Sequence, residues 1–213
     1  DEQWGFVFCK EKTAFLKNYG PEVGDAYVFT AIERTTKLVL AFHLGKRDPD
    51  NTEYFASKLN MATSGRFQLS TDGFRPYLTA IPDAFGQSVD FGQIVKNYNN
   101  PDEAERRRYS PPKIVRTEKL PICGHPDQSR ICTSLSTRMH VRRMARLTNA
   151  HSKKWENHEA MLALYYCFYN WCRTHSTLKS TPAVAAGLAT ETWTLEKLLT
   201  ETAKVERKFA TLS

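Results

Sequence analysis

The run Arg66-Phe67-Gln68-Leu69-Ser70-Thr71-Asp72-Gly73 decides the fold class, because it is a strand-like stretch between two helical ones. Apolar residues before it recur at helical spacing, and Ser64-Gly65 is expected to end that helix. After it, residues 74–85 are predicted to form a helix stopped by Gly86, and residues 89–95 a further strand. Strands separated by helices need crossover connections, so the pattern indicates an α/β fold.

The N-terminal part of the chain predicts an antiparallel meander. Aromatic and β-branched residues at 4–8, 26–32 and 37–44 indicate three strands, and the connection over 33–36 is short enough for a hairpin. Residues 10–21 are expected to form a loop or hairpin that ends in Tyr19-Gly20-Pro21. Together with the two later strands, this predicts a five-stranded mixed sheet: three antiparallel strands, then two reached by helical crossovers, flanked by helices.

The second half of the chain changes character. Residues 97–134 contain several prolines and little periodicity, and are expected to be an irregular insertion. Residues 135–213 are expected to be mainly helical, with a basic helix from 136 to about 147, an aromatic-rich helix over 152–171 and a final helix over 195–210. We expect residues 1–213 to be a single domain, as their number allows.

Composition excludes several classes of protein. No apolar run approaches the roughly 18 residues that a membrane helix needs. The chain shows no signal-peptide pattern, and we expect a cytoplasmic, nucleoid-associated protein with no membrane partner. The five cysteines are scattered without zinc-site spacing, which indicates reduced, mostly packed thiols.

The charge of the chain is unevenly distributed. The formal net charge is +7, and no acid lies between Asp127 and Glu156. Cations without compensating acids repel one another unless a polyanion is present, which favours a nucleic-acid surface over a solvated helical face. Arg173 and His175, just past the aromatic-rich helix, would contact DNA or cap the end of that helix. The predicted DNA-binding residues are Arg138, Arg142, Arg143, Arg146, Lys153, Lys154, Arg173 and His175.

Two aspartates lie at strand-like sites. Asp1 begins the first predicted strand and Asp72 ends the fourth. Carboxylates on adjacent strands hold Mg²⁺ or Mn²⁺, and a pair of such ions activates the nucleophile and stabilises the leaving oxygen in phosphodiester chemistry. The alternative for Asp72 is a helix N-cap or a turn aspartate, and the alternative for Asp1 is a disordered terminus.

The chain resembles the DDE transposases of bacterial insertion sequences, and most closely the insertion-sequence-one-like group. The resemblance covers nearly the whole chain, with its motifs in the family's order, and implies a ribonuclease-H-like catalytic domain in which Asp1 and Asp72 are the first two acids of the catalytic triad. The matching stretches are Asp1-Glu2-Gln3-Trp4, Ser70-Thr71-Asp72-Gly73-Phe74-Arg75-Pro76-Tyr77, Arg146-Leu147-Thr148-Asn149-Ala150, Ser152-Lys153-Lys154-Trp155-Glu156-Asn157-His158, Tyr169-Asn170-Trp171-Cys172-Arg173-Thr174-His175 and Thr177-Leu178-Lys179-Ser180-Thr181-Pro182-Ala183.

The chain departs from the family at the third acid. That acid is expected shortly after a Ser/Thr-Ser pair, but here Thr133-Ser134 runs into Leu135-Ser136-Thr137-Arg138 without one. Glu156 is the remaining candidate for the third metal ligand, with Ser152 as the expected cap of its helix. The alternative is that Glu156 is a structural carboxylate at the start of that helix or faces DNA, and that the true third acid is lost.

The resemblance therefore implies metal-dependent DNA strand cleavage and strand transfer at insertion-sequence ends, by Asp1, Asp72 and Glu156 with a pair of Mg²⁺ or Mn²⁺ ions. The expected partners are insertion-sequence ends, target DNA and further copies of the chain. The domain that reads the terminal repeats is expected to lie N-terminal, outside this chain. Two alternatives are a catalytically impaired or domesticated DNA-binding remnant and a ribonuclease-H-like nuclease.

Overall fold

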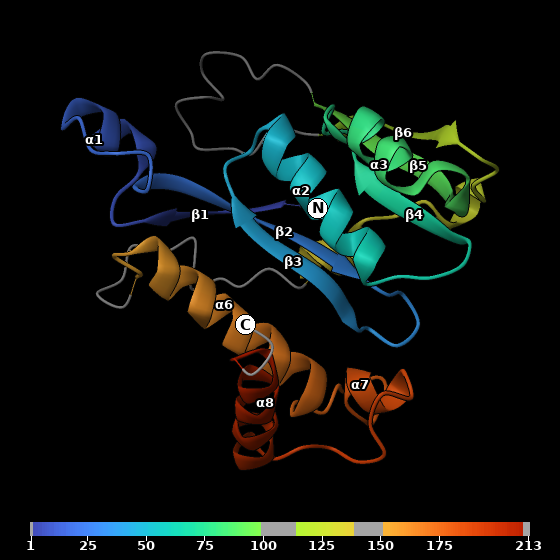
Figure 1. Ribbon diagram of the computed structural model, residues 1–213. Helices are drawn as coiled ribbons and strands as arrows, with labels where there is room; N and C mark the ends of the chain where they lie inside the picture. Colours follow the sequence, from blue (N-terminus) through green and yellow to red (C-terminus); the bar gives the residue numbers. More distant parts are fainter. Residues whose placement is uncertain (1, 99–113, 139–150, 211–213) are drawn as a thin grey trace. The chain divides into compact units, whose positions relative to one another are not determined.

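The computed structural model describes residues 2–98, 114–138 and 151–210, with side chains omitted for 137–138 and 206–210. These residues divide into two compact units, one within 47–140 and the other within 2–46 and 141–213. Each unit combines a three-stranded sheet with helices (Figure 1), so the predicted α/β class is confirmed. The described strands lie in two three-stranded sheets, and the predicted five-stranded sheet is not confirmed.

The first sheet is the predicted antiparallel meander. It contains β1 (Glu2–Val7), β2 (Gly24–Ile32) and β3 (Val39–Gly45), with β2 in the centre. Its core includes Ala26, Val28 and Phe29 of β2, which are fully buried. The β1–β2 connection contains a short helix, α1 (Glu11–Leu16), so the predicted loop or hairpin is wrong there. Glu11 fixes α1 through reciprocal hydrogen bonds, since each of Glu11 and Asp25 donates its backbone N–H to the other's carboxylate.

Of the C-terminal helices, α6 packs on the same sheet, and the two later helices pack on α6. Figure 1 shows α6 (Trp155–Trp171) lying along this sheet, with α7 (Pro182–Ala185) and α8 (Leu195–Ala210) near its C-terminal end. Two side chains of α6 contact the strands directly. The Tyr166 hydroxyl lies 3.1 Å from Thr30 Oγ1. The Asn170 side chain accepts from Val39 N–H at 3.0 Å and donates to Val39 O at 2.9 Å. Long-range polar contacts therefore attach the helix to the meander.

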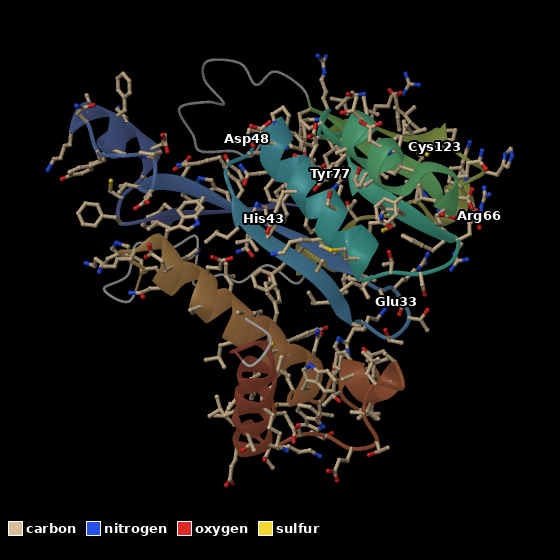
Figure 2. All side chains as sticks on the ribbon, in the orientation of Figure 1. Glu33, His43, Asp48, Arg66, Tyr77 and Cys123 are labelled. Atoms are coloured by element: carbon tan, nitrogen blue, oxygen red, sulfur yellow. The ribbon has the colours of Figure 1, made fainter. Side chains whose placement is uncertain are left out.

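The second sheet contains the parallel strand pair that the sequence predicts. The strand β4 (Phe67–Asp72) is parallel to β5 (Val89–Tyr98), and the connection between them contains α3 (Tyr77–Phe85) and the 3₁₀ turn η1 (Gly86–Ser88). Helix α2 (Pro49–Met61) precedes β4 and begins where Asp48 accepts a hydrogen bond from Asn51 N–H. Figure 2 shows Asp48 at this end of α2 and Tyr77 at the start of α3. Tyr77, Ile81 and Phe85 of α3 supply much of the core of this unit.

A third strand in this sheet was not predicted. The strand β6 (Ile114–Cys123) pairs antiparallel with β5, inside the segment expected to be irregular. That expectation is wrong there, because the prolines that suggested it include Pro121, which an edge strand tolerates. The 3₁₀ turn η2 (Gln128–Arg130) and the short helix α5 (Ser134–Arg138) follow it. Most of the predicted basic helix lies outside the described residues.

An ion pair and one backbone hydrogen bond connect the three strands of the second sheet, at the N-terminal end of β4 and β5. Arg66 binds both Asp90 oxygens at 3.1 and 2.7 Å, and Asp90 Oδ1 also accepts from His125 N–H at 2.7 Å. Arg66 and Cys123 mark this end in Figure 2. Gly124 has φ +67°, and a Cβ there would lie 2.3 Å from Asp90 Oδ1, so the close approach requires glycine. These contacts lower the pKa of Asp90 to about 2, chiefly through the Arg66 hydrogen bonds.

Candidate active site

Asp72 is the last residue of β4, at the carboxyl end of the parallel pair, where it lies opposite Ile94 of β5. Its Oδ1 accepts a hydrogen bond from Phe74 N–H at 3.1 Å, which confirms the interpretation as a turn aspartate. It is not a helix N-cap, because α3 begins only at Tyr77, after Pro76. The Asp72 side chain is 34% exposed, so the turn still leaves the carboxylate open to a ligand.

Arg47 approaches the other carboxylate oxygen. It lies between β3 and α2, and its Nη2 is 3.9 Å from Asp72 Oδ2. Its guanidinium carbon also lies 3.9 Å from the centre of the Phe74 ring, where the negative face of the ring attracts a cation. Arg47 is therefore held over Phe74 beside the carboxylate, and the turn that contains both aspartate and phenylalanine has a cation fixed against it.

Gln93 supports this turn from within the sheet. Its side chain is buried, and Nε2 lies 3.3 Å from both Thr71 Oγ1 and Phe74 O, to which it donates. Gln93 belongs to β5, so the amide fixes the end of β4 through the neighbouring strand. Buried polar groups that are satisfied in this way hold one conformation.

An open cleft of about 570 Å³ surrounds Asp72. Its lining holds three cationic side chains and one carboxylate, with aromatic rings between them. Cations next to aromatic faces suit a nucleic acid, because the cations contact phosphates and the rings stack on bases. The lining residues are Arg47, Asp72, Gly73, Phe74, Arg75, Ile94, Val95, Lys96, Tyr98 and Thr133.

The other two predicted metal ligands are Asp1 and Glu156. Asp1 lies outside the described residues. Glu156 lies in the first turn of α6, exposed, which agrees with its interpretation as a helix-start carboxylate. Ser152 does not cap that helix, since the N-cap is Lys154 and the Ser152 hydroxyl lies 3.0 Å from His158 Nδ1 instead. Asp72 and Glu156 belong to different compact units of the structure.

Asp72 fits one requirement of a magnesium site. Mg²⁺ keeps several waters and is commonly bound by one or two carboxylates plus substrate phosphates, so a partly exposed carboxylate at a strand end is a suitable ligand. Within the described ranges, no three His, Cys, Asp or Glu side chains form a group able to hold a metal ion.

The structure describes five of the eight predicted DNA-binding residues. Lys153, Lys154 and Arg173 are exposed on either side of α6. His175 is half-buried and shapes the following loop, since its Nδ1 accepts from Thr177 N–H at 3.2 Å and its backbone bonds with Ser180 and Lys179. Arg138 ends α5. The remaining three, Arg142, Arg143 and Arg146, lie outside the described residues.

Comparison with family models, with curated proteins and with solved structures found no match.

Sequence reasoning missed Arg47, Gln93 and Lys96, which lie on different segments from Asp72. A signal existed for Arg47, because Lys46-Arg47-Asp48 follows the end of a predicted strand and precedes a helix, the position where ligands bind in α/β sheets. Gln93 gave no such signal, since a glutamine in an apolar strand is informative only once its neighbours are known.

No helix in the described part of the chain is long and apolar enough to cross a membrane.

Proposed function

We propose that this chain is the catalytic domain of a DDE-type transposase of the insertion-sequence-one-like group, with a ribonuclease-H-like fold. The observation that carries the proposal is the partly exposed Asp72 carboxylate at the carboxyl end of β4, in a cleft with three cations. The order of an antiparallel meander followed by a helix-connected parallel pair supports it. In the proposed fold, β1 and β4 would pair so that β1 to β5 form the five-stranded sheet of the family, and β6 is an additional strand beside β5.

The proposed chemistry assigns distinct roles to the residues of the cleft. Asp72 would be a metal ligand with Asp1, and Glu156 the third; bound Mg²⁺ or Mn²⁺ supplies an activated nucleophile and stabilises the leaving oxygen. Arg75 and Lys96 are exposed on the lining and would hold the phosphates of the DNA. Arg47, held over Phe74, would partly balance the Asp72 charge until a ligand binds there. Gln93 keeps the turn in position.

The test is strand cleavage and strand transfer by Asp72→Asn, with Asp83→Asn as the matched control. Asp83 is an exposed aspartate on α3, and it does not line the cleft. With Mg²⁺ or Mn²⁺ and a DNA carrying the element's ends, the wild type and Asp83→Asn should cut and join strands. Asp72→Asn should lose both activities while it keeps its fold and its DNA affinity. Equal activity in the two variants would contradict the proposal.

The products separate the proposal from a nuclease. A transposase joins a 3′-hydroxyl donor to a target strand, whereas a ribonuclease-H-like nuclease stops at the cut. Labelled donor ends should therefore appear in longer target-joined products. Hydrolysis alone, or preference for an RNA–DNA hybrid, would favour the nuclease.

A DNA-binding remnant is the second candidate, and one observation favours it. The cleft has three cations against one carboxylate, which suits phosphate binding without any reaction. In that case no cleavage occurs with either metal, and Asp72→Asn leaves DNA affinity unchanged or raises it because a negative charge is removed.

A further inference from the structure

The strand β6 has one paired edge and one open edge. It lies at the end of the order β4-β5-β6, and among the described residues no strand pairs with its second edge. Ile114, Val115 and Leu120 are 52%, 70% and 39% exposed along it. An edge strand with free N–H and C=O groups is a template for pairing with another strand, and exposed apolar side chains add to that tendency.

The sequence of β6 is complementary to itself when a second copy runs antiparallel about Thr117. In that register Arg116 lies opposite Glu118 of the copy, and Glu118 opposite Arg116. Ile114 then lies opposite Leu120, and Val115 opposite Lys119. Opposite charges and apolar pairs directly across two strands stabilise a sheet, whereas like charges there destabilise it. No like charges meet anywhere from 114 to 120 in this register.

The side chains of β6 are already arranged for this pairing. Arg116 Nε lies 3.1 Å from Glu118 Oε1, and Asn97 of β5 donates to the same oxygen at 3.0 Å. Lys119 is turned away from the pairing, because its Nζ donates to Gln128 O at 2.9 Å. A second copy would therefore add a cross-strand ion pair on each side of Thr117, without bringing the Lys119 charge against the apolar Val115.

We propose that β6 is a homodimerisation edge, at which a second copy of this chain pairs antiparallel about a two-fold axis through Thr117. The dimer joins the two sheets into one continuous sheet in the order β4-β5-β6-β6-β5-β4. The contact is small and its pairs are partly exposed, so the dimer is weak and concentration-dependent. The inference uses only β6 and its neighbours, and it holds whether or not the chain cuts DNA.

A cysteine at the axis tests the register. Directly opposite residues in antiparallel strands have Cα atoms about 4.5–5.5 Å apart, within the range that a disulfide spans. Thr117→Cys should therefore form a disulfide-linked dimer on mild oxidation. Val115→Cys is the matched control, since its own copy would lie four residues away along the strand, about 13 Å at 3.3 Å per residue. The wild-type chain sets the background from its native cysteines, of which Cys132 is exposed.

Charge reversal tests the same edge without new cysteines. Arg116→Glu and Glu118→Arg each place like charges across the axis, and each should weaken dimerisation about tenfold or more, by sedimentation equilibrium. An equimolar mixture of the two variants should dimerise again, because every cross-strand pair is then opposite in sign. Glu191→Arg is the matched control, since it breaks the exposed ion pair with Lys197 away from β6.

Three outcomes would overturn the proposal. The first is a wild-type chain that stays monomeric at all concentrations. The second is cross-linking of Val115→Cys as efficient as that of Thr117→Cys, which indicates random collision. The third is a mixture of the two charge variants that associates no better than either alone. Circular dichroism of each variant excludes unfolding as the cause.

Discussion

Asp72 and Asp90 lie at opposite ends of the same parallel strand pair, and their surroundings give the two carboxylates different chemistry. Asp90 is bound on both oxygens by Arg66 and on one also by His125 N–H. Asp72 has one oxygen in a turn and the other 3.9 Å from Arg47, at the limit of an ion pair. Asp90 is therefore a structural carboxylate, whereas Asp72 is available to a ligand.

Asp90→Asn should destabilise the chain at neutral pH and lose its effect in acid. The contacts lower the folded-state pKa of Asp90 from 3.8 to about 2, so the charged form stabilises the fold above pH 3.8. That stabilisation is lost as the pH falls through about 2. Thermal unfolding across this range should show the variant below the wild type at neutral pH, with the two converging near pH 2. A constant difference would show that shape, not charge, is what the substitution removes.

The buried His158 should give the stability of the fold a second pH dependence, in the weakly acidic range. The ring is buried in α6, with Nδ1 bonded to Ser152 and Nε2 without a partner among the described residues. Burial lowers the pKa of His158 below its usual 6.5. The folded state therefore resists a proton that the unfolded state accepts, and stability falls as the pH drops below 6.5.

His158→Gln should remove part of this acid sensitivity. In urea unfolding between about pH 5 and 8, the wild type should lose more stability on acidification than the variant. His125→Gln, with an exposed side chain, is the control and should behave as the wild type does. Equal acid sensitivity in the wild type and His158→Gln would contradict a neutral buried ring.

For individual residues, the sequence predicted the position on a strand or helix better than the side-chain contacts. It correctly placed Asp72 at a strand end and Glu156 in the first turn of a helix. It did not reveal Arg47 over Phe74 or Gln93 beneath the turn, because these contacts join residues roughly twenty or more positions apart and depend on packing. Ser152 fitted a capping pattern, but its hydroxyl binds His158 and the helix begins later.

Among the elements, the junction of α6 with β3 offers the clearest test of packing. Asn170 satisfies both backbone groups of Val39, which is buried next to the register shift between Ala31 and Ile32. Asn170→Ala leaves a buried N–H and C=O unpaired and should cost roughly 2 kcal/mol of the free energy of unfolding. Asn157→Ala, on an exposed position of the same helix, should cost little. Helix propensity alone would favour alanine at both positions, so similar stability of the two variants would show that the Asn170 hydrogen bonds contribute little.

Elements with strong periodicity were predictable, and those without it were not. The predicted strands 26–32 and 89–95 and the helices over 74–85 and 195–210 match β2, β5, α3 and α8 closely. The alternating charges and Pro121 of β6 are typical of a loop, although the segment forms an exposed edge strand. The N-cap of the short α1 is Lys10, whose side chain makes no capping hydrogen bond, and the helix buries only Ala14, so its local sequence gave little sign of a helix. Neighbouring structure, not local propensity, stabilises both elements.

For the whole molecule, the distribution of charge sets an expectation for DNA binding. The chain has a formal net charge of +7 and many of its cations lie in the acid-free stretch between Asp127 and Glu156. Phosphate contacts carry no sequence information, so binding through these residues should be tight at low salt on any DNA. The cleft around Asp72 adds a second set of cations, Arg47, Arg75 and Lys96, which come from other parts of the sequence.

The salt dependence of DNA affinity should show whether the cleft takes part. Arg75→Glu and Lys96→Glu each remove an exposed cation from the cleft lining, and each phosphate that is no longer neutralised should lower the slope of log affinity against log salt by about 0.9. Lys12→Glu on α1, outside the cleft, is the matched control for the same change in net charge. If the cleft binds DNA, Arg75→Glu and Lys96→Glu should lower the slope and weaken unrelated duplexes equally, measured by fluorescence anisotropy over a salt series. An effect no greater than that of Lys12→Glu would assign DNA binding to other parts of the chain, because net charge alone would then account for it.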